Sequence, residues 1–140
     1  MIDKEYILKD AGLVDEDGVG QVAGSNVIVN LGSGVAEGKL VVDVSAIEVE
    51  SNDELYKISL QGSSKADFAD TYEDLAILEL GAAEVLGGDQ DSTIGRYQVL
   101  FTNQRKNSWE PAIYPYVRLY IDVDGTISTG INFSAYLTKI

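Results

Sequence analysis

Histidine and cysteine are both absent from this chain of 140 residues. The missing thiols exclude disulfides, thiolate metal sites and cysteine nucleophiles, and they fit folding in a reducing cytoplasm. Without imidazole, Ser-His-Asp and Cys-His catalysis are excluded and the commonest transition-metal ligand is missing. We therefore expect no enzyme, no bound metal and no cofactor. The remaining catalytic alternative works through acids alone, such as a glycosidase with a carboxylate pair.

Long apolar runs and basic charge are also scarce. No segment approaches the roughly 18 apolar residues of a membrane-spanning helix. The first residues, MIDKEYILKDAG, are interrupted by charge, so we expect no signal peptide. Ten basic residues against 23 acids leave a net charge of −13. Such a surface repels phosphate backbones and anionic lipid, so we expect neither nucleic acid nor membrane as a partner. Solubility explains this charge, and so does display on the outside of a particle, away from DNA.

The strongest positive signal is the last quarter of the chain. From Tyr116 to Val123, aliphatic residues alternate with tyrosines and charged residues, and a second alternation runs from Ile131 to Thr138. A period of two is typical of strands with one buried face. We expect these two strands at the centre of the structure. Their parity requires either a bulge near Gly130 or a loop through which the chain changes sheet.

Weaker strand patterns fill the rest of the chain. Residues 1–25 are an arm or short first strand followed by a loop rich in Gly and Asp, and residues 62–74 are a single helical turn or an ordered loop. A parity change near Ser45–Ala46 predicts a bulge or a bent strand. Further strands are predicted at Val27–Leu31, Lys39–Val49, Tyr56–Gln61, Leu75–Leu80 and Gly95–Asn103.

Taken together, these patterns predict one domain over residues 1–140. Seven to eight alternating strands with little helix indicate an all-β, antiparallel, jelly-roll-like β-sandwich. The predicted core consists of the apolar members of the best alternations: Ile58, Leu60, Val99, Phe101, Val117, Leu119, Ile121, Phe133 and Leu137.

Four residues are candidates for an interface. Tyr116, Arg118 and Tyr120 share one strand face, and tyrosine and arginine are frequent in protein interfaces. A solvated sheet face explains the same pattern, because strands favour tyrosine anyway. Trp109, in the polar loop before Tyr114, is either a presented anchor or a plug folded against the sandwich rim. The acidic turns Asp15–Gly18 and Asp122–Gly125 lack the later ligands of a calcium loop, so we interpret them as turns.

The order of segments resembles the small jelly-roll type of capsid cement, or decoration, protein on podovirus-like heads of tailed bacteriophages. Each segment is mostly strand pattern with glycine, and the resemblance lies in the series. The segments are LKDAGLV (Leu8–Val14), SNVIVNLG (Ser25–Gly32), ISLQGSSKADFAD (Ile58–Asp70), LAILELG (Leu75–Gly81), GRYQVLFTN (Gly95–Asn103) and YVRLYIDVDGTISTGINFSAYL (Tyr116–Leu137).

This resemblance implies a virion structural protein on the outer surface of the capsid, made in the host cytoplasm and without an active site. Its expected partner is the major capsid protein, whose neighbouring subunits it would bridge to stabilise the shell. It also implies a homo-oligomer, with a dimer favoured. The alternative function is a carbohydrate-binding β-sandwich of a phage tail or fibre, for which Trp109 and Tyr114 are the candidate aromatic platform.

Overall fold

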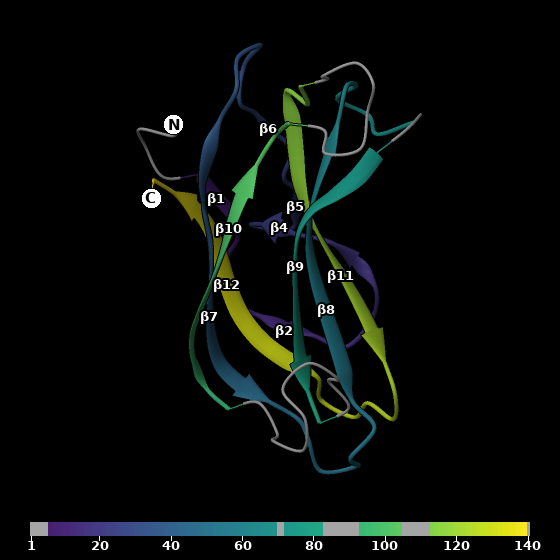
Figure 1. Ribbon diagram of the computed structural model, residues 1–140. Coiled ribbons are helices and arrows are strands. Elements are labelled where there is room, and N and C mark those ends of the chain that lie inside the picture. The colour runs from purple at the N-terminus through teal and green to yellow at the C-terminus, as the bar shows by residue number, and fades with distance from the viewer. Residues whose placement is uncertain (1–5, 70–71, 83–92, 105–112, 140) are drawn as a thin grey trace.

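Strands account for the regular structure of the protein in a computed structural model that describes residues 6–69, 72–82, 93–104 and 113–139 (Figure 1). No helix occurs in these ranges, and so none is long and apolar enough to cross a membrane. The strands are β1 (Tyr6–Lys9), β2 (Leu13–Val14), β3 (Gly18–Val19), β4 (Gln21–Val22), β5 (Ser25–Asn26), β6 (Val29–Asn30), β7 (Glu37–Ile47), β8 (Leu55–Ser63), β9 (Tyr72–Gly81), β10 (Gly95–Thr102), β11 (Tyr116–Asp124) and β12 (Ile131–Thr138).

Two antiparallel sheets face each other (Figure 1). The first has the order β1-β12-β7-β10, with β2 also paired to β12. The second has the order β3-β11-β8-β9, with β6 also paired to β11. The short strands β4 and β5 form a separate hairpin. The predicted all-β antiparallel sandwich is confirmed, and β11 and β12 lie inside their sheets as expected.

The pairing of the main strands is nested along the chain. The first strand β1 pairs with the last, β12, and the next strands β3 and β6 pair with the second last, β11. Inside these pairs β7 pairs with β10, and β8 with β9. The chain therefore follows the path of one long antiparallel hairpin that is folded into two sheets.

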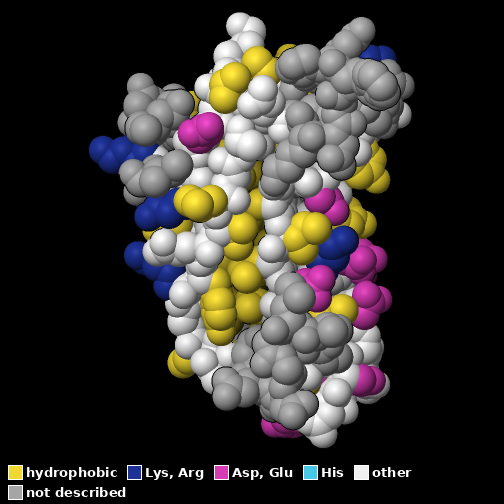
Figure 2. Space-filling view, viewed as in Figure 1, with side chains coloured by type: hydrophobic (Ala, Val, Ile, Leu, Met, Phe, Trp, Pro, Cys, Tyr) yellow, Lys and Arg dark blue, Asp and Glu magenta, His cyan; other side chains and the backbone are white. Residues whose placement is uncertain are grey.

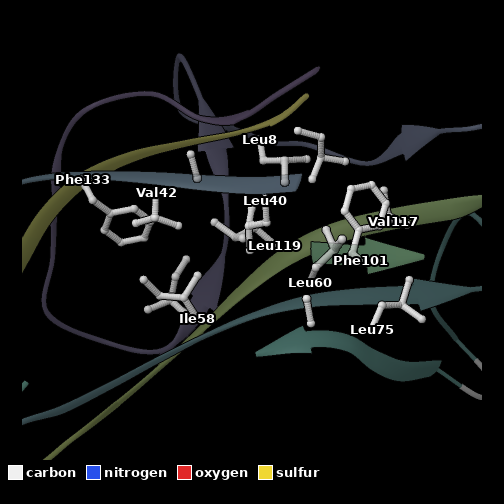
Figure 3. Close-up of a cluster of buried hydrophobic side chains, with 14 of the residues drawn as sticks. Leu8, Leu40, Val42, Ile58, Leu60, Leu75, Phe101, Val117, Leu119 and Phe133 are labelled. Carbon is white, nitrogen blue, oxygen red and sulfur yellow. The ribbon is translucent and has the colours of Figure 1, made fainter. Parts of the chain in front are cut away.

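The core lies between the sheets and draws on both (Figure 3). Leu40 and Phe133 come from the first sheet and meet Ile58, Leu60 and Leu119 from the second. Eight of the nine predicted core residues are buried; the ninth, Val99, is half-buried. Val99 stays partly open because β10 is the last strand of its sheet and has no strand beyond it among the described residues.

Both predicted irregularities of the chain are present. Between β11 and β12 the chain leaves the second sheet and enters the first, which is the second of the two alternatives that the parity of these strands left open. Within β7, Ser45 is skipped in the pairing with β12, where Ala46 faces Asn132 and Val44 faces Phe133. This extra residue is the bulge expected near Ser45–Ala46, and it explains why the apolar parity of β7 changes.

Two acids hold the crossover between β11 and β12. The carboxylate of Glu48 accepts backbone N–H groups from Ser128 (2.9 Å), Thr129 (2.6 Å) and Gly130 (2.9 Å). Asp53 accepts the Thr126 N–H at 3.0 Å and its hydroxyl at 2.7 Å. The Gly130 and Thr129 N–H groups lower the pKa of Glu48, and the Thr126 bonds lower the pKa of Asp53.

One side of the sandwich is covered by β1, β2, β3 and β6, which we call the closed side. Sequence reasoning assigned residues 12–25 to loop, and this is wrong in part, because they contain the two-residue strands β2, β3 and β4 and the first residue of β5. Gly20 explains how closely these strands approach: its N–H donates to the Leu119 carbonyl at 2.8 Å, and an added Cβ would lie 2.7 Å from the Leu8 carbonyl oxygen. Only glycine permits that approach.

Lys9 fastens the closed side to the core. It is 6% exposed, and its Nζ donates to the carbonyl oxygens of Phe133 (2.7 Å), Asp10 (2.9 Å) and Gly12 (3.0 Å). The ammonium also lies 4.5 Å from the centre of the Phe133 ring. Burial lowers the pKa of Lys9, although the nearby Asp10 opposes this shift. The three carbonyl partners compensate a buried charge that would otherwise be unfavourable.

Candidate interaction surface

The outer face of the second sheet carries the three predicted interface residues of β11. Val117, Leu119 and Ile121 point into the core, at 0 to 1% exposure, so Tyr116, Arg118 and Tyr120 point away from it. All three are half-buried, not fully exposed. They are opposite the polar residues Ser63, Gln61 and Ser59 of β8.

Arg118 is the centre of this face. Its guanidinium carbon lies 4.3 Å from the centre of the Phe68 ring, 5.6 Å from that of Tyr72 and 5.8 Å from that of Tyr120. Its Nε donates to the Gln61 side-chain oxygen at 2.9 Å. Cations stacked on aromatic faces at such distances are attracted by the ring quadrupole. The guanidinium is thus already engaged by its own chain.

Phe68 reaches Arg118 from the loop between β8 and β9. Of the range 62–74, which the sequence assigned to a helical turn or an ordered loop, residues 64–69 form a loop without helix. The assignment is wrong at both ends, because residues 62–63 belong to β8 and residues 72–74 to β9. Phe68 has a φ of 53° and is 6% exposed, and its ring centre lies 6.4 Å from that of Tyr72. A positive φ is uncommon outside glycine, so the packing of this ring holds the loop in an unfavourable backbone conformation.

Long side chains cover the middle of this sheet face. Ser59, Gln61 and Ser63 of β8 are 0 to 6% exposed although they point outward. At the margin, Tyr72 is 48% exposed and Ile77, opposite Ser59 in β9, is 44% exposed. We call Phe68, Tyr72, Ile77, Arg118 and Tyr120 the Arg118 patch. It presents an aromatic and an aliphatic group to solvent around a stacked guanidinium.

Acids gather at one end of the patch. Asp122 is opposite Lys57, which makes an ion pair of 3.6 Å with Asp74. Burial, and then the charges of Asp124 and Asp17, raise the pKa of Asp122. Asp17 also accepts the Val123 N–H at 2.7 Å, which ties β3 to β11. The patch is therefore flanked by acidic turns on this side.

The remaining expectations concern the two aromatic residues of the proposed carbohydrate platform and a metal site. Trp109, the fourth interface candidate, lies outside the described residues. Tyr114, its partner in the proposed carbohydrate platform, is 5% exposed and belongs to the core, so it is not a presented ring. In the described ranges, no group of three or more acids is arranged to hold a metal ion.

The sequence identified the β11 face with Tyr116, Arg118 and Tyr120, but not the two aromatic rings, Phe68 and Tyr72, that pack on Arg118. Phe68 and Tyr72, both within the range 62–74, bring their rings together. Their contact with Arg118 joins residues far apart in the chain, and no local pattern encodes it. A large aromatic residue within the polar run SSKADFAD was the available signal. Comparisons of the chain with protein-family models, curated proteins and solved structures found no match.

Proposed function

We propose that this chain is a decoration protein of a tailed-bacteriophage head, which binds the outer surface of the capsid and bridges neighbouring major capsid subunits. The observation that carries the proposal is the nested strand order, β1-β12-β7-β10 facing β3/β6-β11-β8-β9. This is the order expected of a jelly roll, an architecture that viral capsid and lectin domains share. Because one fold serves many functions, the resemblance of the sequence segments points to the capsid among them.

The chemistry of the chain supports a structural role. A chain without histidine or cysteine lacks the commonest general base and the thiol nucleophile, whereas a decoration protein needs neither, because it acts by burying surface. Binding to the assembled shell, and not to its separated subunits, would stabilise the shell by mass action. A net charge of −13 suits a position outside the shell, because it would be unfavourable beside packaged DNA.

The Arg118 patch is the proposed contact with the major capsid protein. Tyrosine and arginine dominate binding energies at interfaces, and here their positions are fixed before binding. Tyr72 and Ile77 are the members that a partner can cover, because each is nearly half exposed.

Binding to heads tests the proposal. Heads of the phage or prophage that carries the gene, prepared without this chain, should retain the purified protein on sedimentation and should then resist heat better. Tyr72→Ser with Ile77→Ser should weaken binding about tenfold or more. Ile7→Ser with Leu13→Ser removes two apolar residues from the closed side that are even more exposed than Tyr72 and Ile77, and it serves as the control. Absence of binding by the unaltered protein would refute the proposed function, and specific glycan binding instead would favour the carbohydrate-binding alternative.

A further inference from the structure

The four edges of the two sheets are protected to different degrees. On the closed side, β2, β3 and β6 have two residues each, and β1 has four with a register shift between Ile7 and Lys9. Short or bulged edge strands offer little to a further strand. These edges are therefore poor sites for pairing with another chain.

The opposite side, which we call the open side, ends in the longer strands β9 and β10. β9 has a register shift opposite Leu60 and Gln61, and it carries Glu73, Asp74 and Glu79. Irregularity and charge are common protections of an edge. A second copy of β9 would also bring acids against acids.

β10 lacks these protections. It pairs with β7 over eight successive positions without a shift, from Gly95 opposite Val44 to Thr102 opposite Glu37. The strand contains no proline, no lysine and no acid. Its one charged residue, Arg96, is neutralised by Asp43 on the neighbouring strand, with Nε 2.7 Å from Oδ1. No described residue pairs with its outer edge.

Apolar groups lie beside this edge, which no described strand covers. Leu100 in β10 and Ile94 just before it are each 64% exposed. A shallow groove of about 290 Å³ follows the seam between β9 and β10, lined by Asp74, Leu75, Ala76, Ile77, Val99 and Leu100. Figure 2 shows hydrophobic side chains along this seam. A strand added to β10 would satisfy its outer backbone groups and cover part of this surface.

We infer that β10 pairs with β10 of a second copy of this chain, in antiparallel orientation about a two-fold axis, so that the two first sheets become one continuous sheet. Charge favours this place for contact between two copies. The chain carries −13, so the two copies repel each other least where acids are absent, and β10 is the long edge without acids. With Arg96 as its one charge, only a register centred on Arg96 itself sets like charges opposite.

The two-fold pairing also fixes which side chains meet. Outward residues of one copy face outward residues of the other, because the axis is perpendicular to the sheet. Gln98 then faces its own equivalent, or Leu100, or Arg96, according to register. The inference places the pairing on β10 and not on the Arg118 patch, since the guanidinium there is already stacked by Phe68 and bonded to Gln61. It does not depend on the proposed role at the capsid.

Sedimentation velocity of the full chain across a broad concentration series tests this inference. The unaltered protein should reach twice the 15.1 kDa mass of the chain, and the β10 amides should exchange hydrogen more slowly at high concentration than at low. The double substitution Gln98→Lys with Leu100→Lys should leave only monomer, because each plausible register then sets lysine against lysine or Arg96. It also reduces the net negative charge, so general repulsion cannot explain the loss.

Ile7→Lys with Leu13→Lys adds the same charge at exposed positions of the closed side and should leave the dimer intact. A monomer at every concentration would overturn the inference. So would a dimer that survives the β10 lysines, or one that both lysine pairs dissolve equally. Amide exchange of the unaltered protein needs no variant, and protection that develops elsewhere than on β10 would also overturn it. Head binding is measured separately, so either proposal can fail alone.

Discussion

The closed and open sides of the sandwich enclose one core but are built differently. On the closed side, strands of two to four residues are fastened by side chains, above all by Lys9 and Asp17. On the open side, β9 and β10 extend over ten and eight residues and lie beside each other at a shallow apolar seam. The closed side is completed by strands of the same chain, whereas on the open side no described strand pairs with the outer edge of β10.

This difference assigns stability and association to different sides of the sandwich. Buried polar groups on the closed side need internal partners, since water is excluded there. The β10 edge needs none while it faces solvent, but it remains able to pair. Stability should therefore depend on residues of the closed side and core, whereas association should depend on residues of the open side.

The largest expected contrast is between Phe133 and Leu100. Phe133→Ala should lower the free energy of unfolding by about 3–5 kcal/mol, because it leaves a cavity in the core and removes the ring under Lys9. Leu100→Ala, at a 64% exposed position of the open side, should change it by less than about 0.5 kcal/mol. Urea unfolding of both variants, at a concentration where the protein is monomeric, measures the contrast. Similar losses of unfolding free energy in both variants would show that Leu100 is packed in the monomer and that the open side is not exposed.

Lys9→Met should produce the next largest effect. The substitution keeps an unbranched side chain but leaves the carbonyls of Asp10, Gly12 and Phe133 without their shared donor. We expect a loss of about 1–3 kcal/mol, the usual range for a buried polar group left unsatisfied. Lys139→Met, at an exposed position after β12, is the matched control and should be near neutral. Hydrogen exchange should increase in residues 6–22 and stay constant in β10.

The sequence predicted the features that depend on neighbouring residues, and it missed those that depend on contacts between distant parts of the chain. The alternations of Tyr116–Val123 and Ile131–Thr138 set which faces of β11 and β12 are buried, because a strand face is a local property. The parity break near Ser45 likewise located a bulge. Local pattern could not reveal β3, whose Val19 pairs with Tyr120 at the other end of the chain. Two residues are too few to show a period.

The Arg118 patch was likewise predictable where it depends on local pattern and not where it depends on contacts between distant residues. Its strand face was predicted, because Tyr116, Arg118 and Tyr120 share a parity. The contact of Phe68 with Arg118 was not predicted, because Phe68 lies in a loop and has a positive φ that the local sequence does not indicate. The edge properties of β10 were visible only in part: its acid-free sequence could be read directly, but its position at the end of a sheet could not.

Tyr56 belongs to neither side, and its titration tests the core that both sides share. Its hydroxyl donates to the Glu48 carbonyl at 3.0 Å, and burial raises its pKa to about 12 from the model-compound value of 10.0. The unfolded chain therefore loses this proton first, and stability should fall as pH rises from 10 toward 12. Tyr56→Phe should cost about 1 kcal/mol at neutral pH and flatten this alkaline decline. An unchanged alkaline profile in urea unfolding would contradict the assignment.

The smallest expected effect concerns the acid side of the pH range and the crossover between β11 and β12, which contacts β2 of the closed side. Glu48 holds the N–H groups of Ser128, Thr129 and Gly130, and Gly130 in turn packs against the Val14 carbonyl of β2, where an added Cβ would clash. Because its folded pKa is lowered, Glu48 contributes stability above its ordinary value of 4.5, and this contribution is lost as pH falls through the lower folded value. Asp53 adds a loss of the same sign below 3.8. Solvent screens both carboxylates, so the effect should be modest.

Hydrogen exchange near pH 4 should show residues 126–131 and β2 loosening before β9 and β10, and Glu48→Gln should produce the same pattern at neutral pH. If acid loosened the open side first, the two sides would not differ in the way their hydrogen bonds indicate.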